Sequence, residues 1–345
     1  MSNLYIAVDC GKYNTKTAWY NAETKKSGEF KFRTKMSKGT FEDDMFDRNT
    51  MIASVDGGPI VKIGNGGKQE PDAETSKKTD IHRFCTLTAV AEACRLNNAK
   101  DADIVIGIPL SIAAIPEERI AYKDFILGQD QSEHTVKLKF SPDKEPVDVK
   151  FAVKKRYVYP EGTGVLYEYP AKLSGPAAII DIGNINTNNI YSINFLPQDD
   201  KCFASELGGK GMISGLAETL TAELGARCDE NLTAATLLKP YEQRYLKPKN
   251  GNKEIEEKSR KIIDDYLRDY VKSVKNLCET RKWPLEYMDI VCVGGTTALV
   301  KKELTDVFGE NLFIPPEPEF VNAKGFLKRL CASCGVKIEV EKNAA

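Results

Sequence analysis

Two polar segments, one near the start of the chain and one near its middle, have residue types that can bind phosphate. Each follows an apolar run that ends in Asp-x-Gly: VDCGKYNTK begins at Val8, and IDIGNINT begins at Ile180. A glycine in a hairpin turn lets successive backbone N–H groups point to one side, and such a nest binds phosphate oxygens. The residues expected to form the two nests are Gly11, Asn14, Thr15, Gly183, Asn186 and Thr187.

The charged residues of the two segments extend this chemistry. Lys16 supplies a cation for a β-phosphate, whereas bare carboxylates at Asp9 and Asp181 would repel phosphate. Aspartates at paired strand ends are suited to hold a hydrated Mg²⁺ ion, because this ion prefers oxygen ligands and keeps several waters. The metal would bridge phosphate oxygens and neutralise developing charge. We therefore expect Asp9 and Asp181 to be the metal residues of a nucleotide site.

A third glycine turn follows another apolar run late in the chain, at Gly294, Gly295 and Thr296. An Asp-x-Gly hairpin by itself is a common turn without function, and that interpretation is favoured for either segment taken alone. Two such segments after buried runs, together with the late Gly-Gly, favour a nucleotide held between two related domains. The chain contains neither G-x-x-x-x-G-K-[ST] nor a Rossmann fingerprint, which excludes those two phosphate-binding motifs.

Hydrophobic periodicity predicts the strands that would position these residues. Continuous apolar runs predict buried strands over 4–8, 103–109, 177–181 and 289–293, with hairpin partners over 17–20 and 191–195. Residues 134–140 and 147–153 alternate polar and apolar side chains, which predicts a half-exposed hairpin with its turn at 141–144. His134 is expected on the exposed side of that hairpin.

Amphipathic periodicity predicts helices between the strands. They are expected over 77–98, 117–127, 165–173, 212–224, 253–281, 297–308 and 323–334. His82, in the first of them, is expected to be a surface or core residue rather than a catalytic one. The order of strand, acidic turn, partner strand, buried strand and helices occurs twice. This repetition predicts a duplicated α/β fold with mixed sheets around a central cleft.

Composition limits the class of protein. The 345 residues carry 49 basic and 50 acidic side chains, so general coating of nucleic acid is not expected. A strand begins almost at the first residue and no apolar run reaches the ~20 residues of a membrane span, so neither a signal peptide nor a membrane contact is expected. Nine scattered cysteines suggest free thiols in the cytoplasm. Cys331 and Cys334 form one C-x-x-C without a second pair, so a zinc site is not expected.

In the order of its loops the sequence resembles the superfamily of actin, sugar kinase and heat-shock chaperone ATPases, and within it the actin-like plasmid segregation (ParM-like) proteins. VDCGKYNTK and IDIGNINT are similar to the family's first and second phosphate loops. VGGT from Val293 resembles its adenosine motif, PEGTG from Pro160 its crossing between domains, and NAKGFL from Asn322 its crossing back. The second loop departs from the family in its four asparagines, Asn184, Asn186, Asn188 and Asn189.

The resemblance implies a two-domain actin-like (ribonuclease H-like) fold, with domain I at 1–172 joined by 322–345 and domain II at 173–321. It implies that Glu161 orients the attacking water, helped by Asp181, although Glu161 in a plain surface turn is the alternative. It also implies that Gly209, Lys210 and Glu218 lie near the ribose. The full set of implied nucleotide-binding residues is Asp9, Gly11, Asn14, Thr15, Lys16, Gly183, Asn186, Thr187, Gly209, Lys210, Glu218, Gly294, Gly295 and Thr296.

The resemblance further implies a Mg²⁺-dependent ATPase that polymerises into head-to-tail filaments and segregates plasmid DNA through a DNA-binding adaptor protein. ATP is the expected nucleotide, GTP stays open, and no direct nucleic-acid contact is expected. The segments at 129–155 and 36–50 are candidate subunit contacts. A sugar or acid kinase is an alternative, although no loop suggests its catalytic Asp and substrate pocket. A chaperone-like ATPase is another, although no substrate-binding domain is expected after the core.

Overall fold

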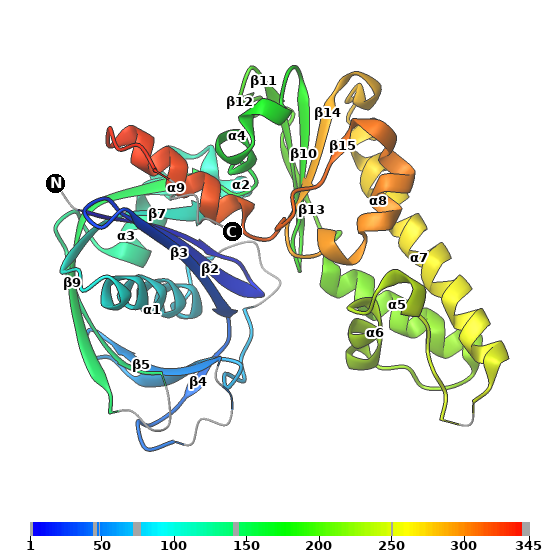
Figure 1. Ribbon diagram of the computed structural model, residues 1–345, viewed down its shortest axis with the longest axis horizontal. Coiled ribbons are helices and arrows are strands. Elements are labelled where there is room, and N and C mark those ends of the chain that lie inside the picture. Colours follow the sequence, from blue (N-terminus) through cyan, green and yellow to red (C-terminus); the bar gives the residue numbers. More distant parts are fainter. Residues whose placement is uncertain are drawn as a thin grey trace. The chain divides into compact units, whose positions relative to one another are not determined.

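The computed structural model describes residues 3–43, 47, 49–71, 77–140, 145–249 and 251–339. The chain forms two compact units, the first made of Met1–Tyr169 and Phe320–Ala345 and the second of Pro170–Glu319. Each unit is built on a β-sheet of its own (Figure 1). The predicted turn at 141–144 and part of the candidate contact at 36–50 lie outside the described residues.

The described part of the first unit contains a nine-stranded sheet in the order β3-β2-β1-β7-β9-β8-β5-β6-β4. Strand β1 pairs with β7 and β7 pairs with β9, both in parallel, so the carboxyl ends of these three strands lie at one edge. The strands are β1 (Leu4–Cys10), β2 (Asn14–Asn21), β3 (Lys26–Arg33), β4 (Met36–Lys38), β5 (Thr50–Val55), β6 (Ile60–Gly64), β7 (Asp101–Ile108), β8 (Glu133–Lys139) and β9 (Val147–Pro160).

Helices cover both faces of this sheet (Figure 1). Helices α1 (Asp80–Leu96) and α3 (Pro116–Leu127) share a core with the even-numbered residues of β1, and α9 (Val321–Ser333) shares a core with the odd-numbered ones. Successive side chains of a strand point to opposite faces. Asp9 therefore lies on the same face as Tyr5 and Ala7, the face that α9 covers. The short helices α2 (Leu110–Ala113) and α4 (Val165–Glu168) complete the unit.

The second unit repeats the arrangement with a smaller mixed sheet, in the order β12-β11-β10-β14-β15 with β13 paired to β11. Strand β10 is antiparallel to β11 and parallel to β14, as β1 is to β2 and β7. The elements are β10 (Ala177–Ile182), β11 (Thr187–Ile193), β12 (Leu196–Pro197), β13 (Phe203–Ser205), α5 (Gly209–Leu224), α6 (Glu230–Leu237), α7 (Lys253–Thr280), β14 (Asp289–Val293), α8 (Lys301–Phe308) and β15 (Leu312–Phe313).

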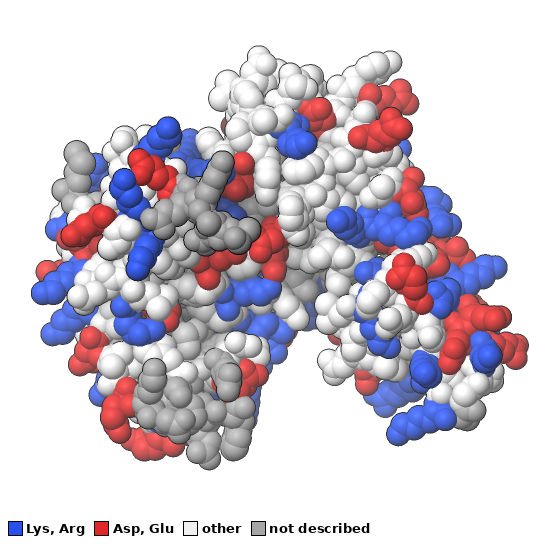
Figure 2. Space-filling view, in the orientation of Figure 1, with Lys and Arg blue, Asp and Glu red and all other residues white. Residues whose placement is uncertain are grey.

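Helix α7 shows how the sequence pattern fixes a helix face. Its buried residues recur every three or four positions, among them Ile263, Leu267, Val271 and Val274, and they pack in the core of the second unit. On its outer surface Lys272 pairs with Asp269 at 3.1 Å. Acidic and basic side chains are mixed over the surface of the molecule (Figure 2). None of the helices formed by the described residues combines the length and apolar character that a membrane span requires.

The duplicated mixed α/β fold expected from the sequence is confirmed, while two of the expected elements are cut short and a third is interrupted. The helix predicted over 165–173 stops at Glu168, because Pro170 offers no N–H and restricts the residue before it. The strand predicted over 191–195 stops at Ile193, since Asn194 and Phe195 have positive φ and form a turn. The helix predicted over 297–308 is a 3₁₀ turn at Thr297–Leu299 followed by α8.

Two glycines fix how α9 packs on the segment after β9. A methyl group at Gly325 would overlap the carbonyl group of Gly164, and one at Gly164 would approach Asn322 Cα to 2.5 Å. We predict that Gly325→Ala lowers the unfolding free energy by about 1–3 kcal/mol, measured by urea denaturation. Gly211→Ala is the control, because Gly211 is also helical but has open space around it. Equal stability of the two variants would contradict the prediction.

Candidate functional site

The turn between β1 and β2 forms the first predicted phosphate loop. The N–H of Gly11 donates to the carbonyl oxygen of Asn14 at 3.0 Å, and Cys10 stands opposite Thr15 in the hairpin. The Thr15 side chain is buried and contacts the hydroxyl of Thr34 at 2.9 Å. Only the backbone of Thr15 is therefore available to a ligand, as the nest hypothesis requires.

Asp9 and Lys16 face each other across the hairpin next to this loop. Lys16 Nζ lies 2.9 Å from Asp9 Oδ2, and Asp9 is only 3% exposed. Burial acts to raise the pKa of Asp9, but the charges of Lys16 and Lys77 outweigh it, so the pKa is lowered. Asp9 is thus an ionised carboxylate held by cations inside the first unit.

Glu161 lies at the end of β9, close to Asp9. Its N–H donates to the carbonyl oxygen of Ile108 at 2.9 Å, and its side chain is buried, which removes the alternative of a solvated surface acid. Gly107, at the end of β7, separates the two carboxylates: a methyl group there would lie 3.4 Å from Asp9 Oδ1 and 3.5 Å from Glu161 Cγ. Three parallel strand ends therefore bring these two predicted residues together.

Lys77 completes a group that we call the charge cluster: Asp9, Lys16, Lys77 and Glu161. Lys77 Nζ donates to Glu161 Oε1 and, at 2.9 Å, to the carbonyl oxygen of Cys10. Burial acts to lower the pKa of Lys77, but Glu161 and then Asp9 outweigh it, so the pKa is raised. The cluster therefore holds two cations and two anions.

Asn322 connects the charge cluster to α9. Its Oδ1 accepts hydrogen bonds from the N–H groups of Gly162 at 3.0 Å and Gly164 at 3.4 Å. A hydrogen bond from its side chain also helps to lower the pKa of Asp9. The segment that resembles the family's crossing back thus supports the Glu161 turn and Asp9 at once.

The turn between β10 and β11 has the same backbone geometry as the first loop. The N–H of Gly183 donates to the carbonyl oxygen of Asn186 at 2.9 Å, three residues ahead as in the first hairpin. Asp181, which is 7% exposed, stands opposite Asn188 on β11. Because Asp9 stands opposite Lys16, Asn188 occupies the position that the lysine has in the first loop.

Two further predicted segments converge on the second loop. The Gly209 N–H donates to the Gly183 carbonyl oxygen at 3.0 Å, and the Thr296 hydroxyl donates to the same oxygen at 2.8 Å. Gly294 has φ of +94°, and a methyl group there would approach Asp181 Oδ1 to 2.5 Å. The structure thus brings together the second loop, the start of α5 and the end of β14.

The remaining residues expected near the ribose are less closely tied to the loop. The Lys210 N–H donates to the Asn184 carbonyl oxygen at 2.7 Å, but the Lys210 side chain is exposed. Glu218 is also exposed, and it lies nine residues after Gly209 on α5, which corresponds to about 13 Å along the helix axis. Gly209 and the Lys210 backbone therefore belong to the loop, whereas Glu218 stays a prediction.

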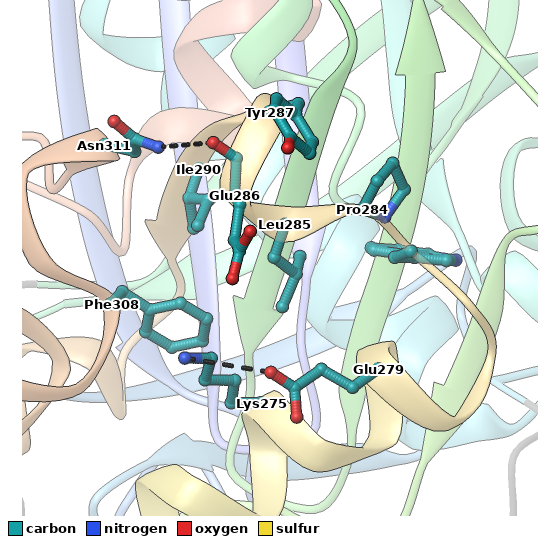
Figure 3. A pocket seen from close by; sticks show the side chains of 10 residues that line it. Lys275, Glu279, Pro284, Leu285, Glu286, Tyr287, Ile290, Phe308 and Asn311 are labelled. Atoms are coloured by element: carbon teal, nitrogen blue, oxygen red, sulfur yellow. Dashed lines mark hydrogen bonds and ion pairs between the residues drawn. The ribbon is translucent and has the colours of Figure 1, made fainter.

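A groove of ≈ 380 Å³ lies elsewhere in the second unit, and Figure 3 shows its lining. Lys275 Nζ and Glu279 Oε1 are 3.7 Å apart within it, and the Asn311 side chain donates to the Glu286 carbonyl oxygen at 3.3 Å. None of the residues predicted to bind nucleotide lines this groove, so it is separate from the phosphate loops.

The comparison with protein families agrees with this geometry. Residues 7–164, which include the first loop and the Glu161 turn, match the model of the actin-like protein N-terminal domain. Residues 7–164 thus form an actin-like N-terminal domain. The resemblance inferred from the loops is therefore confirmed. No curated protein matches the sequence.

Solved structures extend the likeness to nearly the whole chain. A structure described as the Alp12 filament is 23% identical, with a TM-score of 0.71 over 97% of this chain and 100% of that chain. The archaeal actin homologue Ta0583 in complex with ADP is 17% identical, with a TM-score of 0.68 over 95% and 99%. The psk41 ParM protein without ligand is 11% identical, with a TM-score of 0.69 over 97% and 99%. At these identities the comparison shows a shared fold.

The sequence assigns no site role to three residues of the two loops and their surroundings. Lys77 stands beside another lysine before a helix, Asn188 lies in an asparagine-rich run, and Asn322 begins the segment that resembles the family's crossing back. Pairing of β10 with β11 identifies Asn188, and tertiary contacts identify the other two. Both histidines are buried. His82 is fully buried beside the first loop, with its carbonyl oxygen 3.8 Å from Cys10 Sγ, and His134, expected to be exposed, has its ring 3.0 Å from Asp56 Oδ2.

His82 makes stability depend on pH. Burial, then Lys77 and Lys12, lower its pKa from 6.5 to about 3. Between these values the unfolded chain binds a proton that the folded chain does not, so the unfolding free energy falls as the pH decreases. We predict that His82→Gln removes up to about 1.4 kcal/mol per pH unit of this slope, measured by urea denaturation between pH 7 and pH 4.

His134→Gln is the matched control, because it also removes a buried histidine, one whose ring nitrogens contact Asp56 and the Leu127 carbonyl oxygen. In this control the unfolding free energy should still fall with decreasing pH by the amount that His82 contributes. A His82→Gln variant with the parental slope would show that His82 is protonated equally in both states.

Proposed function

We propose that this actin-like protein binds ATP with Mg²⁺, hydrolyses it, and assembles into filaments in a nucleotide-dependent way. One observation carries the proposal: each unit has an Asp-x-Gly hairpin closed by the same Gly-to-Asn backbone hydrogen bond, and the first of them adjoins the charge cluster. The archaeal relative solved with ADP supports nucleotide binding, and the relative solved as a filament supports assembly.

The phosphates are the part of the nucleotide that we assign to the hairpins. The backbone N–H groups of Gly11, Asn14 and Thr15 would form one nest, and those of Gly183, Asn186 and Thr187 the other. Lys16 would give up part of its contact with Asp9 to a phosphate oxygen. Gly209, Gly294, Gly295 and Thr296, around the second loop, would contact the nucleoside, with Lys210 and Glu218 towards the ribose. The same contacts to phosphate would suit GTP as well as ATP.

The donor set of each unit suits a hydrated Mg²⁺ ion. Each hairpin offers one buried carboxylate, Asp9 or Asp181, and no described group of three or more His, Cys, Asp or Glu residues is arranged to hold a metal by itself. Mg²⁺ binds proteins through one or two carboxylates together with substrate phosphates and waters. When bound, the ion would neutralise the charge that develops on the phosphates.

Glu161 would orient the attacking water. Phosphoryl transfer needs a positioned nucleophile and stabilised charge more than covalent chemistry from the protein. A buried carboxylate can accept a hydrogen bond from the water and so direct its lone pair towards phosphorus. Asp181 would assist as the second catalytic residue.

The biological role that we propose is segregation of plasmid DNA by polymerisation. The subunits would associate head to tail, because heterologous contacts that do not close produce a filament. DNA would be reached through an adaptor protein, since the chain's charges are balanced. All nine cysteines are free thiols, which supports a place in the reducing cytoplasm. The two compact units would be the two actin-like domains.

Light scattering with Mg-ATP tests the proposed function. We predict that scattering of the purified protein rises after Mg-ATP is added, that the rise depends on protein concentration, and that phosphate appears in the same sample. Mg-ADP is the nucleotide control. A flat signal at all protein concentrations, with phosphate release only when a sugar is present, would instead support the kinase alternative.

The role of Glu161 has a test of its own. We predict that Glu161→Ala still assembles with Mg-ATP. Its phosphate release should be slower by up to about a hundredfold, because the attacking water loses its hydrogen-bond acceptor. Phosphate release and light scattering should be recorded together. Glu117→Ala, at an exposed acid of α3, is the control and should behave as the parent protein. A Glu161→Ala variant with the parental rate of phosphate release would refute the assignment.

A further inference from the structure

We propose that Lys77 is a positioning residue for hydrolysis, which ties the Glu161 carboxylate to the first phosphate loop. The inference rests on the proposed function and adds to it a residue that no motif marks. Lys77 touches neither water nor phosphate in this role; it acts through Glu161.

The first reason is the pair of contacts that Lys77 makes. One ammonium group donates both to Glu161 Oε1 and to the carbonyl oxygen of Cys10. Cys10 is the last residue of β1 and directly precedes Gly11, whose N–H closes the loop. The lysine therefore links the backbone at the start of the phosphate nest to the carboxylate expected to orient the water.

The second reason is the cost of placing a lysine there. The Lys77 side chain is 7% exposed and the Glu161 side chain 9%, so both charges are withdrawn from water. A buried ion pair gains little net stability over apolar packing, whereas leaving one partner alone is strongly unfavourable. Such a pair is difficult to explain as a stabilising feature, but it fits a site that needs an ionised carboxylate in a fixed place.

The third reason is that the two cations of the charge cluster have different partners. Lys16 pairs with Asp9, and its side chain is the more exposed of the two lysines, at 14%. Lys77 pairs with Glu161 deeper in the first unit. Lys16 is thus suited to meet a phosphate, while Lys77 is suited to keep Glu161 in place when the phosphate arrives.

A double-mutant cycle on the full chain tests this assignment. The variants are Lys77→Met, Glu161→Gln and the combination of both, and the readouts are kcat for phosphate release and Kd for ATP. We expect Lys77→Met to lower kcat about tenfold to a hundredfold, as a misplaced catalytic group does, with Kd changed much less. Because Lys77 acts through Glu161, adding Lys77→Met to Glu161→Gln should change kcat less than about twofold.

Lys328→Met is the matched control, since this lysine also pairs with a glutamate of the first unit, Glu168, at 3.0 Å. It should keep the parental kcat. If Lys77→Met does not fold, the combined variant still tests the inference, because it leaves no unpaired charge at the positions of Lys77 and Glu161. Its kcat should equal that of Glu161→Gln. A combined variant that is much slower than Glu161→Gln would overturn the inference, because Lys77 would then act independently of Glu161.

The same experiment separates this inference from the proposed function. A parental protein that neither binds ATP nor releases phosphate would overturn the proposed function, and the role of Lys77 with it. A parental protein that hydrolyses ATP while Lys77→Met keeps its kcat would leave the function standing and overturn only the role of Lys77.

Discussion

The burial of the Asp9 carboxylate at the end of β1 is the constraint on which the first unit depends. An ionised group that is 3% exposed must be matched by positive charge and hydrogen bonds, or its desolvation would destabilise the fold. Lys16 from β2, Lys77 before α1 and Asn322 from α9 supply that compensation. One carboxylate therefore holds β2, the segment before α1 and α9 to the end of β1.

The two hairpins share a backbone but differ in charge. Both place a glycine two residues after the aspartate and close the turn on an asparagine carbonyl oxygen. In the first hairpin the residue opposite the aspartate is Lys16, and in the second it is the neutral Asn188. The asparagine-rich second loop thus lacks the cation that the first loop has opposite its aspartate.

Close backbone contacts make this arrangement possible. Gly164 and Gly325 let α9 approach the segment after β9 so closely that Asn322 reaches the Glu161 turn. In the second unit Gly208 and Gly209 let α5 begin against the β10–β11 turn, where a side chain would overlap Ile185 or Thr296. Each contact joins segments that no local sequence pattern relates to one another.

The sequence by itself determined the strands on either side of the two loops, most helices and the two Asp-x-Gly hairpins, because period-2 and period-3.6 patterns and glycine turns are local properties. It also marked Asp9, Lys16 and Asp181, since each stands at a fixed offset from a strand end or a glycine, whereas Glu161 was marked by the resemblance to a family. Only the tertiary structure decided that Glu161 is buried rather than solvated, that His134 lies inside, that Lys77 completes the charge cluster, and that Asn322 connects the cluster to α9. Those facts depend on which strand ends and helix starts meet in space, and a buried ion pair leaves no periodic trace in the chain.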